Sequence, residues 1–238
     1  MKHTISLFSA LCLLIVSCDD GHVDDPAYDL RKDGFNVQIT GTFDGLDSWQ
    51  DGYSVVAAAF DGESEYSLIQ KTLPSSAEEA SVKLSGIPAE AHTVEIAVVN
   101  TLRKRIATLR SYALSDYDES DTIRIAAGAL DVSMFSAISQ CVLDGSWANC
   151  SMCHQGASAA ARLDLSAGKA YASLVNVPAE KNAEMMRVLP YDASKSFFYK
   201  VIAEGDENVG YSHTGLFSED RYRVWLDVIR LWIEGGAR

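Results

Sequence analysis

The sequence predicts an exported chain of the α+β class, with a β-sandwich domain followed by a small all-α domain. Three observations lead to this prediction: an apolar N-terminal run that ends at a cysteine, alternating apolar and polar residues in the middle of the chain, and helical spacing of apolar residues toward the C-terminus. With 238 residues, 47% of them hydrophobic and 22% charged, the chain is long enough for two modest domains. The expected divisions are a signal peptide at 1–17, a lipidated tether at 18–33, a β-sandwich at 34–128 and a helical domain at 129–238.

The N-terminus has the features of a bacterial export signal. Lys2 precedes a mostly apolar run from Ile5 to Val16, which is too short to span a bilayer as a mature helix. The run ends in Ser17-Cys18, which resembles the lipobox of bacterial lipoproteins, where cleavage makes the cysteine a new N-terminus that carries lipid. The alternative is an ordinary signal peptide with an accidental cysteine. We expect a cell-envelope protein held to a membrane by lipid on Cys18, facing the periplasm or the outside.

The charge balance bears on the partners of the protein. The formal net charge is -13 at pH 7. A surface of this sign repels a phosphate backbone, so we expect no nucleic-acid partner. Solvated negative charge is the simplest interpretation of the acidic composition.

Six apolar stretches with strand character follow the tether. Turn residues separate many of them, such as Asp51-Gly52 and Asp61-Gly62 around one stretch. This spacing is typical of a sandwich of immunoglobulin-like or fibronectin-like size. We see no catalytic constellation in this region, and His92, beside a turn, is expected to be exposed. The stretches are 35–39, 53–60, 81–84, 93–99, 106–112 and 122–125.

After Gly128 the periodicity of the apolar residues becomes helical. Asp131 is available as the N-cap of a first helix, and Ser218 as the N-cap of the last. Gly235-Gly236 is expected to end that last helix. Its aromatic and aliphatic stripe is expected to pack in the core of this domain. The candidate helices contain Val132 to Val142, Lys169 to Val175, Ser196 to Ala203, and Tyr222, Trp225, Ile229 and Trp232.

One motif carries recognisable chemistry. Cys150-Ser151-Met152-Cys153-His154 has the Cys-x-x-Cys-His spacing of a c-type haem attachment site. With five Cys and five His in the chain, chance produces this pattern only about 0.002 times in a sequence of this length. Residues i and i+3 lie on one side of a helical turn, so two thiols can bond the two vinyl groups of one haem while His154 binds the iron.

Three alternatives to haem attachment remain open for this motif. A thioredoxin-like dithiol requires a strand-helix-strand unit around the Cys-x-x-Cys, and no such unit is predicted. A structural zinc site requires four ligands, which Cys141 or His213 can complete, although adjacent Cys and His ligands fit poorly around one tetrahedral ion. A plain disulfide between Cys150 and Cys153 gives His154 no role. Cys141 itself, on an apolar face, is expected to be a buried free thiol.

The C-terminal part of the chain resembles a family of small c-type cytochrome domains found in exported planctomycete and Bacteroidetes proteins. The resemblance covers less than half of the chain. It implies a cytochrome c-like all-α domain with one covalent haem c on Cys150 and Cys153, and His154 as the proximal iron ligand. The stretches that carry it, besides the motif, are Phe135-x-x-Ile138, Leu163 to Ser166, Ala170 to Pro178, Arg187 to Pro190, Ser196 to Lys200, Leu216 to Ser218 and Ile229 to Ala237.

The sequence departs from this family at the distal iron ligand. The family has a Met-Pro pair shortly before the Leu-Ser that opens its last helix, and the corresponding stretch here, 209–215, has no Met. His213 is the only histidine after His154, and we expect it to be the distal ligand. Met185 or Met186 are alternatives, as is an iron with no distal protein ligand. An imidazole in place of the thioether makes a haem easier to oxidise.

The sequence therefore favours a monohaem c-type cytochrome lipoprotein that transfers electrons to or from redox partner proteins at the cell envelope. No nucleophile triad, acidic pair or phosphate loop accompanies the motif, so we do not expect an enzyme. Two other functions remain: a haem enzyme that reacts with peroxide, which requires an open distal site, and a structural zinc domain for protein interaction. The role of the sandwich is predicted only as a spacer or docking surface.

Overall fold

The computed structural model describes residues 34–75, 78–117 and 122–238. Contacts divide the chain into two units, Met1–Lys32 and Asp33–Arg238, and the description below concerns the second unit. The predicted signal peptide, the lipid-bearing Cys18 and the tether at 18–33 lie outside the described residues.

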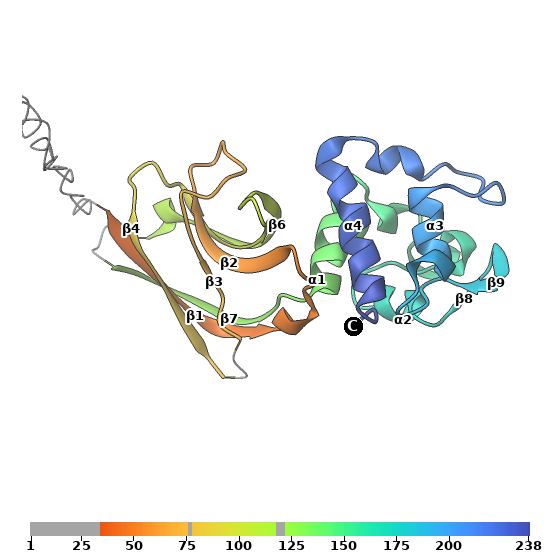
Figure 1. Cartoon of the computed structure of the whole chain (residues 1–238), viewed down its shortest axis with the longest axis horizontal. Coiled ribbons are helices and arrows are strands. Elements are labelled where there is room, and N and C mark those ends of the chain that lie inside the picture. The colour runs from red at the N-terminus through yellow and green to blue at the C-terminus, as the bar shows by residue number, and fades with distance from the viewer. Residues whose placement is uncertain (1–33, 76–77, 118–121) are drawn as a thin grey trace, which may run out of the picture. The chain divides into compact units, whose positions relative to one another are not determined.

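Seven strands form the first part of this unit, and they include all six of the predicted stretches. The strand that the sequence did not predict has only four residues, too few to display an alternation. Figure 1 shows the strands in two facing sheets. The strands are β1 (Phe35–Asp44), β2 (Tyr53–Phe60), β3 (Ile69–Thr72), β4 (Ala80–Ile87), β5 (Thr93–Asn100), β6 (Arg105–Ala113) and β7 (Thr122–Asp131).

The order of the strands differs from that of an immunoglobulin domain. One sheet has the order β4-β1-β7 and the other β3-β2-β5-β6. β1 pairs antiparallel with β4 and parallel with β7, so that Ile39 lies between Val82 and Ile125. In the immunoglobulin constant arrangement, the first, second, fourth and fifth strands share one sheet. The two-sheet architecture agrees with the prediction, but the immunoglobulin-like topology was wrong.

The sandwich core lies between the two sheets. It contains side chains from both, among them Val37, Ile39 and Leu84 from one sheet and Val94 and Ile96 from the other. β2 and β5 are buried on both faces, and their side chains on the outer side of the sheet form a second apolar cluster of five residues, Val56, Ala58, Phe60, Ala97 and Val99. The burial of both faces accounts for the continuous apolar runs of these two strands in the sequence, where strict alternation is absent.

The second part of the unit is not the cytochrome c-like all-α domain that was predicted. Only one of its helices exceeds seven residues, a strand pair interrupts them, and the described residues taken together are mostly β-sheet with 30% helix. The segment Val175-Asn176-Val177-Pro178 is responsible for part of the error. β-branched residues and proline disfavour helix, and Asn176 adopts a left-handed conformation with φ 57°.

The helices of this part are α1 (Met134–Ile138), α2 (Ala170–Leu174), α3 (Phe197–Ala203) and α4 (Asp220–Glu234), with a π-helical turn, η3 (Ser139–Leu143), directly after α1. Short 3-10 turns make up much of the rest. The strand pair is β8 (Pro178–Ala179) and β9 (Asn182–Met186). The 3-10 turns of the unit are η1 (Leu46–Ser48), η2 (Leu114–Asp116), η4 (Cys150–Met152), η5 (Gly156–Ser158), η6 (Ala160–Arg162), η7 (Ala193–Lys195) and η8 (Thr214–Phe217).

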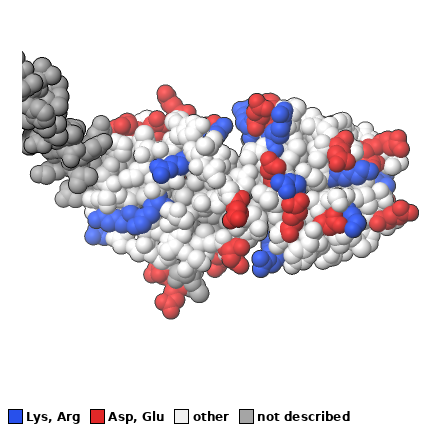
Figure 2. Space-filling view, in the orientation of Figure 1, with Lys and Arg blue, Asp and Glu red and all other residues white. Residues whose placement is uncertain are grey.

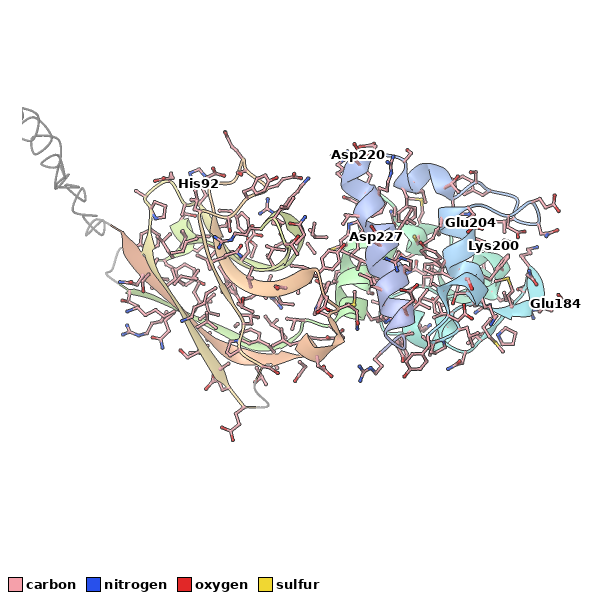
Figure 3. The ribbon with its side chains drawn as sticks, in the orientation of Figure 1. His92, Glu184, Lys200, Glu204, Asp220 and Asp227 are labelled. Carbon is pink, nitrogen blue, oxygen red and sulfur yellow. The ribbon has the colours of Figure 1, made fainter. Side chains whose placement is uncertain are left out.

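The apolar stripe of α4 forms the centre of the second core, as predicted. Trp225, Ile229 and Trp232 are almost fully buried, and Trp232 lies against Phe135 with 5.1 Å between ring centroids. α3 packs beside α4. In Figure 3 the label Lys200 marks α3 and the label Asp227 marks α4.

Both predicted N-caps were wrong by a residue or two. Ser133, not Asp131, caps α1, because its hydroxyl accepts a hydrogen bond from the Ser136 N–H. Glu219 precedes α4 without a side-chain cap, and the Ser218 hydroxyl instead donates to the carbonyl of Gly215. The predicted end of α4 at Gly235 is confirmed.

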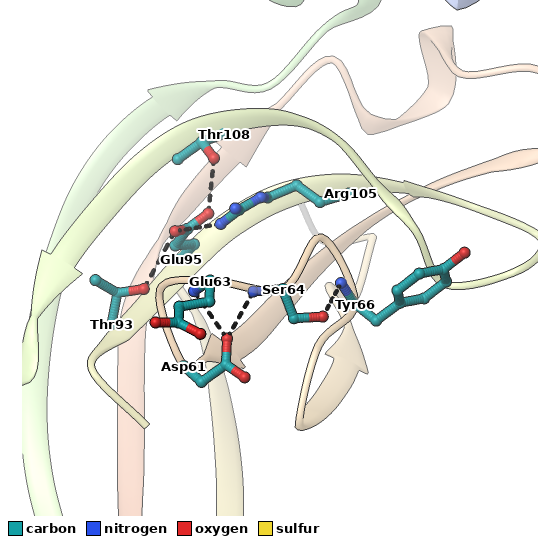
Figure 4. A network of polar contacts seen from close by, with 8 residues as sticks. All are labelled: Asp61, Glu63, Ser64, Tyr66, Thr93, Glu95, Arg105 and Thr108. Atoms are coloured by element: carbon teal, nitrogen blue, oxygen red, sulfur yellow. Dashed lines mark hydrogen bonds and ion pairs between the residues drawn. The ribbon is translucent and has the colours of Figure 1, made fainter. Parts of the chain in front are cut away.

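A buried charge network ties β5 to β6 (Figure 4). The Glu95 carboxylate is 5% exposed, and it accepts hydrogen bonds from the hydroxyls of Thr93 and Thr108 and forms an ion pair with Arg105 at 2.8 Å. The Arg105 guanidinium also lies 4.3 Å from the centre of the Phe60 ring. Both oxygens of this buried carboxylate are thus paired, which is the condition for burying a charge at tolerable cost.

The rest of the charge lies on the surface. Figure 2 shows acidic and basic side chains interspersed over the face in view. Within the described ranges, no helix has the length and apolar character needed to cross a membrane.

We predict that Glu95→Ala lowers the free energy of unfolding by about 2 kcal/mol, because it leaves a half-buried Arg105 and two hydroxyls without their acceptor. Urea unfolding measures this loss. The control is Glu65→Ala, which removes the partner of Lys104 from an ion pair at the surface and is expected to cost at most about 0.5 kcal/mol. If both variants lost the same free energy of unfolding, the buried Glu95 network would stabilise the protein no more than a surface ion pair does.

Candidate functional site

The Cys-x-x-Cys-His motif forms a single tight turn. Asn149 adopts the left-handed conformation with φ 44° and starts the 3-10 turn η4 at Cys150. The Cys150 carbonyl accepts hydrogen bonds from the N–H groups of Cys153 at 3.3 Å and His154 at 3.1 Å. These bonds wind the chain through one turn between the two cysteines, which is the local geometry that the spacing predicts.

The cysteines of this turn are free thiols in the structure, as is Cys141 in η3. Cys150 is half-buried and packs against the second core, whereas Cys153 is exposed. Burial raises the pKa of the Cys150 thiol to about 11 and that of Cys141 to about 11. Catalytic dithiols need a lowered pKa, so the environment of Cys150 is opposite to that of a thioredoxin-like site. Cys141 is a free thiol, as expected from the sequence, and it is half-buried.

His154 is held in a defined tautomer. Its Nδ1 lies 2.9 Å from the carbonyl oxygen of Ala160. A carbonyl can only accept, so Nδ1 carries the proton, and Nε2 of the neutral ring keeps a free electron pair. Metal-binding histidines in proteins typically donate their other ring N–H to a carbonyl or carboxylate in this way. The His154 carbonyl in turn accepts from the N–H of Leu165, a buried core residue, at 2.7 Å.

His213 lies opposite His154. The two ring centroids are 6.2 Å apart, and the ring planes make an angle of 39°. Residues 154 and 213 are far apart in the sequence, and His213 is positioned at the start of η8, where Phe217 anchors the turn in the core. Tyr211 packs its ring edge-on against His213, with 5.1 Å between centroids. Met185 and Met186, the other distal candidates, lie in β9.

One nitrogen of His213 has no partner. Its Nδ1 is buried, and within the described part of the chain no group forms a hydrogen bond with it. A buried polar atom without a partner is costly, and an ion or ligand at the site is one physical reason for its presence.

Both imidazoles favour the neutral state. Burial lowers the pKa of His154, and the charge of Arg187 lowers it further, while the backbones of Ala160 and Leu163 raise it. Burial also lowers the pKa of His213, followed by the charge of His154, while the backbone of Tyr211 acts in the opposite direction. The neutral ring is the form that binds a metal, so both histidines are ready to act as ligands near neutral pH.

The separation of the two rings fits two imidazoles on one iron. A metal–nitrogen bond is about 2 Å long and a ring nitrogen lies about 1 Å from its centroid, so two imidazoles on one metal have centroids about 6 Å apart. The observed 6.2 Å matches this requirement. The donor set also fits, because two thiols, one imidazole in a fixed tautomer and one imidazole with an unpartnered nitrogen meet around one turn.

The described residues do not form a set of protein ligands for another kind of metal site. Among residues 34–75, 78–117 and 122–238, no group of three or more His, Cys, Asp or Glu side chains is placed to hold a metal ion. A structural zinc ion needs four protein ligands, whereas a porphyrin supplies four of the iron ligands and leaves two positions for the protein. His92 is exposed at the turn before β5, as expected (Figure 3).

Two groups that sequence reasoning missed hold the His154 ring in its orientation: the Ala160 carbonyl and the Arg187 side chain. Ala160 belongs to the loop 156–163, and the side chain of Arg187 donates hydrogen bonds to two carbonyls of that loop. Nothing in the sequence marks Ala160, because its contribution is a backbone oxygen. Arg187 stood out in the sequence only as part of the family resemblance.

Comparison with known proteins finds no match for this chain, neither among protein-family models nor among curated proteins.

We predict that protein purified without haem becomes less stable as the pH falls below 6.5, the ordinary pKa of histidine. The unfolded chain takes up protons on these imidazoles between that pH and the lower pKa of the folded protein, so acid favours unfolding in this range. Urea unfolding at several pH values between about 7.5 and about 5 is the measurement. His213→Gln removes one of the two groups, so its stability should change less with pH. Identical pH dependence in the two proteins would contradict the lowered pKa of His213.

Proposed function

We propose that this protein is a monohaem c-type electron carrier of the bacterial cell envelope. One haem c is bonded through thioethers to Cys150 and Cys153, with His154 as the proximal and His213 as the distal iron ligand. The observation that carries the proposal is the pair of imidazoles, 6.2 Å apart and both favoured in the neutral state, beside the two thiols of a Cys-x-x-Cys-His turn.

The residues of the turn attach the cofactor. Each thiol adds its S–H bond across one vinyl group, so that sulfur bonds to one carbon and hydrogen to the other, without any oxidant. The bound haem supplies one-electron redox chemistry, and covalent attachment prevents its loss from an exported protein.

The two histidines favour electron transfer over catalysis at the iron. With an imidazole on each side, no iron position is left for a substrate, as reaction with peroxide requires. Cys153 is exposed, as are Met152 at 74%, inside the motif, and Tyr211 at 64%, whose ring lies against His213. This part of the site is open to solvent, which supports electron exchange with redox partner proteins.

The location of the protein rests on its N-terminus. The Ser17-Cys18 pattern supports a lipid anchor, and the envelope is where c-type haem attachment protects an exposed cofactor. The proposed partners are other redox proteins of the envelope.

The covalent bonds are tested by mass spectrometry of denatured protein from a host that attaches haem. The chain with haem is expected to weigh about 616 Da more than the same chain without haem. Cys150→Ser with Cys153→Ser should remove this added mass. Cys141→Ser is the matched control, because Cys141 is also a half-buried free thiol whose pKa burial raises to about 11, and it should keep the added mass. A wild-type chain without added mass would rule out the proposal.

The distal ligand is tested by His213→Ala. We expect the ferric haem to change from low-spin to high-spin, because an imidazole ligand is lost, and electron paramagnetic resonance measures this change. His92→Ala alters an exposed histidine of the sandwich and should remain low-spin. A low-spin His213→Ala protein would exclude His213 as the ligand, and a second variant, with both Met185 and Met186 changed to Ala, would then test those two residues.

A further inference from the structure

The loop that orients His154 has an unusual backbone. Ala161 and Arg162, two consecutive residues with side chains, have φ of 53° and 48°. Residues other than glycine rarely adopt this left-handed conformation, and almost never twice in succession. The preceding residue, Ala160, gives the carbonyl that accepts the Nδ1–H of His154, and its own N–H donates to the carbonyl of Cys153 at 3.0 Å. The strained loop is therefore joined to the motif at both of these points.

The guanidinium of Arg187 holds this loop in place. It donates to the carbonyl of Ala161 at 3.0 Å, to that of Arg162 at 3.1 Å, and to that of Ser173 in α2 at 2.8 Å. Arg187 directly follows β9, and its N–H donates to the Val177 carbonyl. Strained conformations persist when surrounding groups over-determine them, and three hydrogen bonds from one planar group do so here.

Arg187 also places a positive charge near the proximal histidine. Its nitrogens bond carbonyls, and among the described residues no carboxylate lies within ion-pair distance of it. The nearby Glu180 instead pairs with Arg162 at 2.9 Å. The charge of Glu180 acts on Arg187 without a direct ion pair, and the charge of Arg187 acts on the His154 imidazole.

We propose that Arg187 is a positioning residue that sets the reduction potential of the haem, by clamping the loop 156–163 so that the Ala160 carbonyl keeps its hydrogen bond to His154. This inference rests on the proposed function. A firmly held Nδ1–H bond makes the imidazole a stronger electron donor, which favours ferric iron and lowers the potential. The positive charge acts in the opposite direction, so the two effects must be separated by experiment.

Arg187→Lys separates them. Lysine keeps the charge but lacks the planar fork that reaches three carbonyls. We expect the midpoint potential to shift to more positive values, because only the support of the hydrogen bond is lost. The control is Arg162→Lys: the Arg162 side chain is 83% exposed, and Arg187 uses only its backbone carbonyl. Its potential should equal that of the wild type. An unchanged potential in Arg187→Lys would overturn the proposal.

Limited trypsin digestion tests the clamp without reference to haem. Trypsin cuts after Arg162 only if the loop opens, and Arg187→Lys should release the peptide that ends at 162 faster than the wild type does. Arg162→Lys keeps a cleavage site at this position and should be cut as slowly as the wild type. If the wild type carries no haem, the proposed function fails, and this assay still decides whether the clamp exists. Equal cleavage in all three proteins would overturn the clamp.

A measurement on the wild type removes any dependence on the folding of the variants. In ¹⁵N-labelled protein the Nδ1 proton of His154 should exchange slowly with solvent, because the clamped Ala160 carbonyl accepts it. Rapid exchange of this proton would contradict the proposed role of Arg187.

Discussion

The hydrogen bond from His154 Nδ1 to the Ala160 carbonyl is the contact on which the candidate site depends. It fixes which ring nitrogen carries the proton, and it leaves Nε2 with the electron pair that a metal needs. It also fixes the plane of the ring, so that His213 can lie 6.2 Å away with an unpartnered nitrogen. Without this bond the tautomer of the imidazole is not specified.

The rest of the second part of the fold supports that bond. The motif is fixed at one end by the αL turn at Asn149 and at the other by Leu165, whose N–H donates to the His154 carbonyl and whose side chain is buried. The β8–β9 pair presents Arg187 to the loop between these points. In a helix, backbone carbonyls accept hydrogen bonds from other backbone groups. The irregular backbone around the motif leaves carbonyls free to accept hydrogen bonds from the side chains of His154 and Arg187.

The sequence predicted what depends on local patterns. The strands β2 and β5 and the helices α3 and α4 follow from apolar runs and spacing, and the Cys150-to-His154 turn from its motif. The predictions failed for features that depend on contacts between residues far apart in the sequence. The immunoglobulin-like topology was wrong because strand order leaves no local trace, and the all-α prediction was wrong because short 3-10 turns and a hairpin replace helices. The role of the Ala160 carbonyl could not be predicted from the sequence, since any residue supplies a carbonyl.

The absorption spectrum of the mature protein, produced in a host that attaches c-type haem, tests the central claim most directly. We expect a coloured protein whose ferric and ferrous spectra are both those of a low-spin haem with two nitrogen ligands, and whose colour stays with the polypeptide after denaturation. A colourless protein from a host that loads other c-type cytochromes would contradict the haem assignment, and would leave the thiols, the two histidines and their orienting loop to another function.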